Sequence, residues 1–178
     1  MVIVIRCGLA ITKQQDQSTG SEMEIETIGD GPGVTIEQQI RWGDMDARGH
    51  INNIIFFQYA ESARVAYFAA LEVERIAHNP NEGTILGRAD MNFRKQMHFP
   101  GKILVTANAT KISRRSMIMT YTLRDAASDE VVADGESVMV WIDYSTGKAV
   151  PIPDPMVETV ARLEQTDVAN LKGEVSSE

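Results

Sequence analysis

The sequence "GDMDARGHINNIIFFQYAESARVAYFAAL", Gly43 to Leu71, decides the fold. Its first eleven residues hold two aspartates, a histidine and two asparagines, and the rest is mostly apolar. The apolar part contains no Gly or Pro and is too long for an ordinary strand, so it predicts a helix from about Ile54 to Leu71. Asn52 or Asn53 suits the N-cap of this helix. Because the helix is apolar on nearly all sides, we expect it to be buried.

Runs with strand character lie on both sides of this helix. One run, Val34–Trp42, precedes it. Four runs follow it: Thr84–Arg94, Lys102–Ile112, Ser116–Arg124 and Glu130–Tyr144. The short polar connections between these four favour hairpins and an antiparallel meander. After a proline-spaced segment, Met156–Leu171 has helical spacing.

This order of elements predicts an α+β fold, in which one antiparallel sheet wraps around a long central helix and a helix ends the chain. We expect residues 1–33 to be a flexible N-terminal extension, 34–171 a single domain, and 172–178 a tail. One sheet of this kind leaves an edge open. Two copies are therefore expected to pair edge to edge, as a homodimer or as a dimer of dimers, a homotetramer.

Composition excludes several classes of protein. A chain of 178 residues with 43% apolar and 24% charged residues is ordinary for one soluble domain. No apolar run approaches the roughly 20 residues that span a membrane. The net charge of −8 and the absence of a motif argue against nucleic-acid binding, and the three histidines do not have zinc-site spacing. The single cysteine, Cys7, has no internal disulfide partner, so a reducing compartment, the cytoplasm, is expected.

The charge is uneven along the chain. Between Arg88 and Arg124 lie eight Lys and Arg residues but one acidic residue, Asp90. Such a stretch could be a binding site for an anion such as a phosphate. The alternative is a set of solvated strand-edge charges that deter aggregation.

The segment "RWGDMDARGHINNIIFFQYAESAR", Arg41–Arg64, resembles the signature of the hotdog-fold acyl-CoA thioesterases of the 4-hydroxybenzoyl-CoA thioesterase type. The shared pattern is a strand ending in an aromatic, then D-x-D, a small residue, G-H-[IV]-N-N, and an apolar helix with Glu-x-x-Arg. The order of strands and helix also matches that fold over roughly residues 34–144. The resemblance implies a hydrolase with a hotdog fold that acts on an acyl-CoA. It implies no cofactor, because coenzyme A is part of the substrate.

Thioester hydrolysis requires a group that activates or supplies the nucleophile and a donor that stabilises the oxyanion. By resemblance, Asp46 matches the catalytic carboxylate, acting as general base or as direct nucleophile. Asn53 matches the position whose backbone N–H faces the thioester oxygen. We expect His50 to shape the loop or to form a hydrogen bond near the carboxylate, Asp44 to accept hydrogen bonds from loop amides, and Gly49 to supply backbone freedom.

Glu61 is the alternative catalytic residue. It lies in the narrow polar face of the predicted helix, and some hotdog enzymes use a helix glutamate for catalysis. The structural alternative is a buried ion pair or hydrogen bond with a strand or with a partner subunit, because an unpaired buried carboxylate is costly.

The phosphates of coenzyme A require cations. The candidates are two pairs, Arg94 with Lys95 and Arg114 with Arg115, acting across the dimer interface. Two other functions are compatible with the sequence. One is an acyl-carrier-protein thioesterase, although Arg48 stands where plant-type members carry asparagine. The other is a non-catalytic protein that binds acyl-CoA.

Overall fold

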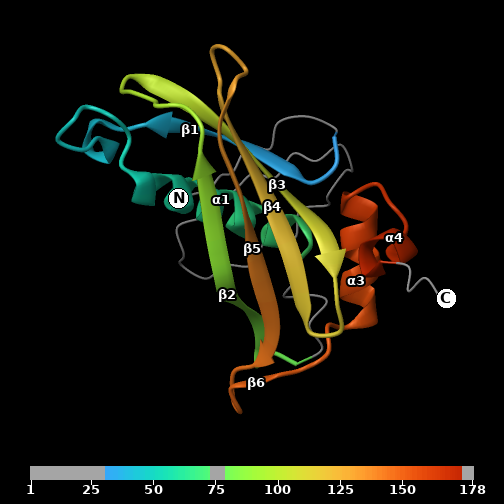
Figure 1. Ribbon diagram of the computed structural model, residues 1–178. Coiled ribbons are helices and arrows are strands. Elements are labelled where there is room, and N and C mark those ends of the chain that lie inside the picture. The colour runs from blue at the N-terminus through green and yellow to red at the C-terminus, as the bar shows by residue number, and fades with distance from the viewer. Residues whose placement is uncertain (1–30, 73–78, 174–178) are drawn as a thin grey trace, which may run out of the picture.

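A computed structural model describes residues 31–72 and 79–173 (Figure 1). The elements, in chain order, are β1 (Val34–Ile40), η1 (Trp42–Asp44), α1 (Asn53–Ala70), β2 (Glu82–Phe93), β3 (Gly101–Ile112), β4 (Ser116–Asp125), β5 (Val131–Asp143), β6 (Lys148–Ala149), α3 (Asp154–Leu163) and α4 (Val168–Lys172). The strands form one antiparallel sheet in the order β1-β3-β4-β5-β2, with β6 paired to β5. The predicted α+β fold is confirmed.

Some predictions concern residues that lie outside the described ranges. These are Cys7, most of the expected N-terminal extension, and most of the expected tail. Among the described residues, no helix combines the length and the apolar character needed to cross a membrane.

Strand β2 lies at the far edge of the sheet and not beside β3. β3, β4 and β5 are consecutive neighbours, as a meander requires. β2 pairs instead with β5, with Thr84 opposite Trp141 and Phe93 opposite Ala133. The prediction of a four-strand meander was therefore wrong for β2. The connection, residues 94–100, must cross two strands to reach β3, about 14 Å, which a segment of this length can span.

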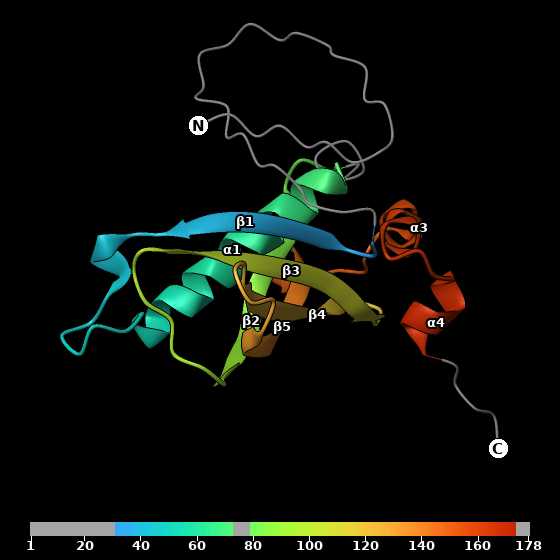
Figure 2. The ribbon, with the colours of Figure 1, turned by 90° about the horizontal axis from the view of Figure 1, so that it is seen from above.

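Helix α1 crosses one face of the sheet, behind the strands in Figure 1 and close to β1 in Figure 2. Its buried residues recur at helical spacing and are Phe56, Tyr59, Ala60, Ala63, Ala66 and Tyr67. The small alanines allow the helix backbone to approach the strands closely. The opposite stripe is open, because Ile54 is 61% exposed and Val65 is 42% exposed. The prediction of a helix buried on all sides was therefore wrong for this stripe in the single chain.

The C-terminal helical segment is broken, whereas the sequence predicted one helix over Met156–Leu171. α3 ends at Leu163, Gln165 takes a left-handed conformation with a φ of 53°, and α4 starts at Val168. The N–H of Thr166 donates to the carbonyl of Ala161 and that of Gln165 to the carbonyl of Arg162, the Schellman arrangement that ends a helix. At the C-cap, the side chain of Glu164 turns into the protein.

The carboxylate of Glu164 is buried and joins three elements. Its Oε1 accepts hydrogen bonds from the hydroxyl of Tyr67 on α1 and from the backbone N–H of Ala109 on β3, both at 2.6 Å. Its Oε2 accepts a third from Asn108 Nδ2 at 2.9 Å. Burial, followed by the charge of Glu164, raises the pKa of Tyr67, so this hydroxyl remains a donor. Glu164 thus fixes the C-terminal helices to the central helix and the sheet.

Replacing Glu164 with alanine should lower the free energy of unfolding by about 3 kcal/mol, because each buried donor left without a partner costs about 1–3 kcal/mol. Urea unfolding of the purified variant measures this loss. Glu158, which is exposed on helix α3, provides the control, since Glu158→Ala should change stability by less than about 0.5 kcal/mol. Equal losses in the two variants would contradict this role for Glu164.

Candidate active site

Asp44 connects the polar loop to helix α1. Its side chain is 8% exposed, and its Oδ2 accepts hydrogen bonds from the backbone N–H of Arg41 at 2.7 Å and the hydroxyl of Tyr59 at 2.8 Å. Its backbone carbonyl accepts from the N–H of Asn52 at 2.9 Å. Burial and the hydrogen bond to Asp44 raise the pKa of Tyr59, which keeps that hydroxyl a donor. Asp44 therefore has the structural role that the sequence predicted.

Asp46 lies two residues on, at the start of a tight chain reversal. Its N–H donates to the carbonyl of His50 at 2.8 Å, and its carbonyl accepts from Gly49 N at 3.0 Å. Its side-chain Oδ1 accepts from the backbone N–H groups of Arg48, at 2.8 Å, and His50, at 3.3 Å. Gly49 has a φ of +80°, which glycine adopts without strain.

The Asp46 carboxylate is exposed and ionised, and one of its oxygens is free. The hydrogen bonds from the amides of Arg48 and His50 lower the pKa of Asp46 below its ordinary value. Both of these bonds use Oδ1. Within the part of the chain that the structure describes, Oδ2 accepts no hydrogen bond, so this oxygen is available to water or to a bound molecule.

The N-terminus of α1 begins directly after this loop. Asn52 is its N-cap, and the Asn52 side chain accepts from Ile54 N at 3.1 Å while its carbonyl accepts from Ile55 N at 2.9 Å. The N–H of Asn53 bonds to no acceptor among residues 31–72 and 79–173. The cap thus leaves one helix N-terminal amide unoccupied, where the helix dipole favours negative charge.

His50 acts in the loop mainly through its backbone. Its N–H donates to Asp46, and its ring packs edge-on against the ring of His98, with centroids 5.0 Å apart. His98 follows β2, and its Nδ1 lies 2.8 Å from the carbonyl oxygen of Gly49. The sequence analysis missed His98, because nothing local connects residues that are 49 positions apart.

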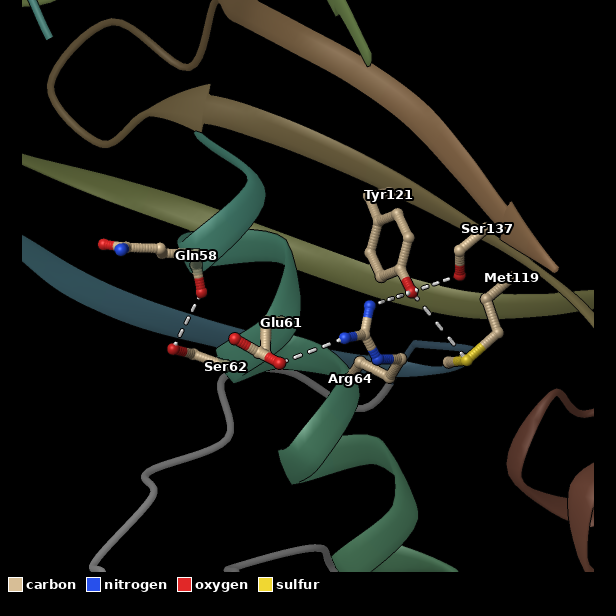
Figure 3. Close-up of polar contacts among 7 residues, drawn as sticks. All are labelled: Gln58, Glu61, Ser62, Arg64, Met119, Tyr121 and Ser137. Atoms are coloured by element: carbon tan, nitrogen blue, oxygen red, sulfur yellow. Dashed lines mark hydrogen bonds and ion pairs between the residues drawn. The ribbon is translucent and has the colours of Figure 1, made fainter. Parts of the chain in front are cut away.

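Glu61 lies two turns further along α1, about 12 Å from Asn53 along the helix axis. It is 64% exposed in the single chain and contacts Arg64 at 3.4 Å, so this chain alone does not bury the carboxylate as expected. Arg64, which is 12% exposed, reaches the hydroxyl of Tyr121 at 3.4 Å, and that hydroxyl bonds to Ser137 at 2.7 Å. Figure 3 shows Arg64 directed at these two strand residues. The structure does not bring Glu61 to Asp46.

The basic stretch is largely neutralised in three dimensions. Its ion pairs are Arg88 with Asp90 and Glu136, Arg94 with Asp134, Lys95 with Glu130, Lys102 with Glu37, and Arg124 with Asp129. Pairing with Asp134 raises the pKa of Arg94, while Arg94 lowers the pKa of Asp134. Among the described residues, Lys111, Arg114 and Arg115 have no carboxylate partner.

The two candidate pairs for phosphate binding lie at opposite ends of the sheet. The N–H groups of Arg94 and Lys95 bond to Val132 at the start of β5, and Trp141 near its end donates to the carbonyl of Arg115. These β5 positions are about 30 Å apart along the strand. The loop of Asp46 is at the Arg94 end, because Ile51 N donates to the carbonyl of Met97 in the β2–β3 connection.

Comparison with known proteins gives the family of the chain. Residues 40–160 match the family model of the thioesterase-like superfamily. The chain belongs to this superfamily. The uncharacterised protein YsmA of Bacillus subtilis (strain 168) is 26% identical over 121 residues, which cover 68% of this chain and 80% of YsmA.

Two solved structures show the same hotdog thioesterase fold. The PA2801 protein of Pseudomonas aeruginosa, named as a candidate thioesterase, has a TM-score of 0.65 and 28% identity and covers 71% of this chain and 97% of its own. A thioesterase of Thermus thermophilus, solved with coenzyme A and zinc, has a TM-score of 0.67 and 24% identity. That match covers 78% of this chain and 100% of the other. The predicted hotdog fold is therefore confirmed, and thioester hydrolysis is the activity of the family in general.

Proposed function

We propose that this protein is an acyl-CoA thioesterase of the 4-hydroxybenzoyl-CoA thioesterase type, which hydrolyses an acyl-CoA to the free acid and coenzyme A. One observation carries the proposal. An ionised carboxylate with a free oxygen, Asp46, and an unoccupied helix N-terminal amide, Asn53 N–H, lie within one short segment of the chain. The two supply what thioester hydrolysis needs, a base or nucleophile and an oxyanion donor.

In the proposed reaction the thioester carbonyl oxygen accepts a hydrogen bond from Asn53 N–H. Asp46 Oδ2 either takes a proton from a water molecule that attacks the carbonyl carbon, or attacks that carbon itself. As the new C–O bond forms, negative charge gathers on the carbonyl oxygen, where the N-terminal end of α1 stabilises it. The C–S bond then breaks and coenzyme A leaves as its thiolate, which takes up a proton. When water is the nucleophile, the acid is released directly. When Asp46 is the nucleophile, an acyl-aspartate anhydride forms, and a water molecule hydrolyses it to release the acid and restore the carboxylate.

We propose that the active unit is a homodimer, alone or as half of a tetramer. β2 is open along one edge because it pairs with β5 alone among the described strands. This edge strand exposes Ile85, Leu86 and Phe93, each more than 40%. The open stripe of α1 adds the exposed Ile54 and Val65. A second copy pairing antiparallel along β2 would cover these apolar groups and close the sheet edge.

Such a dimer favours Arg114 and Arg115 as the phosphate ligands. Antiparallel pairing of two β2 strands sets the start of one beside the end of the other. The partner's β3–β4 turn, which carries this pair, would then lie toward the Asp46 end of the first subunit. Arg94 and Lys95 are already paired with Asp134 and Glu130. The crystallised relative that contains coenzyme A supports coenzyme A as the carrier.

Acyl-carrier-protein hydrolysis and non-catalytic binding are the alternatives. Assays with matched acyl-CoA and acyl-carrier-protein substrates show which carrier the protein prefers. Release of free thiol from a panel of acyl-CoAs distinguishes an enzyme from a protein that only binds acyl-CoA. The proposal includes a cytoplasmic location, which rests on the single cysteine of the sequence.

Replacing Asp46 with asparagine should lower kcat for thiol release by about 10²–10⁴-fold, the usual contribution of a general base. Glu61→Gln should stay within about threefold of the wild type, because Glu61 lies two turns from the helix N-terminus. Thiol release from an acyl-CoA measures both variants, and circular dichroism checks their fold. Normal turnover in Asp46→Asn with a large loss in Glu61→Gln would transfer the catalytic role to Glu61.

The pH dependence of turnover tests whether Asp46 is the base. Because the loop amides lower the pKa of Asp46, its carboxylate stays ionised as the pH falls. We expect kcat/KM to stay level from about pH 7.5 to about pH 5 and to fall only near or below the ordinary aspartate pKa of about 3.9. A fall centred well above the ordinary aspartate value would show that Asp46 is not the base. Fluorescence of the buried Trp141 reports at each pH whether the protein is still folded.

A further inference from the structure

His98 joins the Asp46 loop to the connection between β2 and β3. It lies in the β2–β3 connection, residues 94–100, and its Nδ1 is 2.8 Å from the carbonyl oxygen of Gly49. The preceding residue, Met97, accepts a hydrogen bond from Ile51 N at 3.0 Å. The connection therefore bonds to the loop on both sides of His50. The side chain of His98 bonds to Gly49, and the backbone carbonyl of Met97 bonds to Ile51.

The hydrogen bond from His98 to the Gly49 carbonyl lies next to the two amides that position the carboxylate of Asp46. Gly49 stands between Arg48 and His50, whose N–H groups both donate to Asp46 Oδ1. Gly49 N also donates to the carbonyl of Asp46. A shift of the Gly49 peptide would move both donors of the carboxylate together and would turn its free oxygen, Oδ2.

The tip of the loop, residues 46–50, has few other contacts with the rest of the described chain. Ala47, Arg48 and Gly49 are exposed, and residues 46–50 otherwise bond to one another. Among the described residues, the bond from His98 is the hydrogen bond that joins this tip to another element. The edge-on contact between the rings of His98 and His50 adds a second restraint.

The geometry also fixes the role of the imidazole nitrogen. The Gly49 carbonyl oxygen can only accept, so His98 Nδ1 must carry the proton and donate it. No charge on the ring is required, since the neutral tautomer with Nδ1–H makes the same bond. A side chain that places one N–H donor at this point would therefore replace His98.

We propose that His98 is a positioning residue, whose Nδ1–H holds the Gly49 carbonyl and thereby aims the free oxygen of Asp46 at the space before the N-terminus of α1. This inference rests on the proposed function of Asp46. Reactions of this kind lose about 10²-fold in rate when a reacting group is displaced by about 1 Å, so a restraint on an exposed loop has a direct effect on turnover.

Three substitutions separate the possible roles of His98. His98→Asn places an amide N–H where Nδ1 stands, His98→Gln places one nearer to Nε2, and His98→Leu has no donor. We expect His98→Leu to lower kcat by about 10–100-fold with KM within about threefold, and His98→Asn to recover most of that loss. Recovery by His98→Gln and not by His98→Asn would mean that Nε2 acts on the substrate, which overturns the positioning role.

A second measurement does not depend on turnover. A carbon-13 NMR titration of the Asp46 carboxyl should show its pKa rising toward the ordinary aspartate value in His98→Leu, because the amides of Arg48 and His50 are no longer held in place. In His98→Asn the pKa should remain low. Both variants lack the imidazole, so a shift common to both reflects the loss of the ring, and a shift confined to His98→Leu reflects the hydrogen bond.

The two measurements together distinguish failure of this inference from failure of the proposed function. If the wild type releases no thiol but the Asp46 pKa rises in His98→Leu alone, the positioning role stands and the thioesterase proposal fails. If the wild type is active and His98→Leu matches it in kcat and in the pKa of Asp46, the positioning role is wrong. If His98→Leu does not fold, the comparison of His98→Asn with His98→Gln still tests the positioning role, because only His98→Asn places a donor where Nδ1 stands.

Discussion

The structure of the site depends on the hydrogen bond between the hydroxyl of Tyr59 and the buried carboxylate of Asp44. Asp44 also accepts from Arg41 N, at the end of β1, and its carbonyl accepts from the N-cap residue, Asn52. One aspartate thus fixes the end of the first strand, the start of the helix and the helix interior relative to one another. The loop between Asp44 and Asn52 can project into solvent because its two ends are held. Asp46 is exposed, and the amides of Arg48 and His50 hold its carboxylate within this loop.

The local part of this arrangement was predictable from the sequence. Asn52 caps α1 as its residue type predicted, because a cap depends on atoms two residues apart. The left-handed Gly49 and the structural Asp44 follow from the same short segment. The helix and the five long strands also lie close to their predicted bounds. In each case the interaction that decides the structure lies within a few residues of the pattern that predicts it.

Predictions from the sequence were wrong or incomplete where the contact that decides the structure joins residues far apart along the chain. The residues between β2 and β3 indicate a connection but do not show that β2 pairs with β5. A helical pattern over Met156–Leu171 does not show that Glu164 turns inward to Tyr67 and Ala109. The basic stretch has the composition of an anion site, yet its Arg94 and Lys95 face Asp134 and Glu130 across neighbouring strands. His98 was missed for the same reason.

The central claim is that the backbone N–H of Asn53 stabilises the oxyanion, and one pair of variants tests it. Asn53 occupies the first helical position, where proline is well tolerated, and the extended backbone of Asn52 suits a residue before proline. Asn53→Pro therefore removes the N–H while keeping the helix, and Asn53→Ala keeps the N–H while removing the side chain. We expect kcat for thiol release to fall by about 10²–10³-fold in Asn53→Pro and hardly to change in Asn53→Ala. A folded Asn53→Pro variant with wild-type turnover would contradict it.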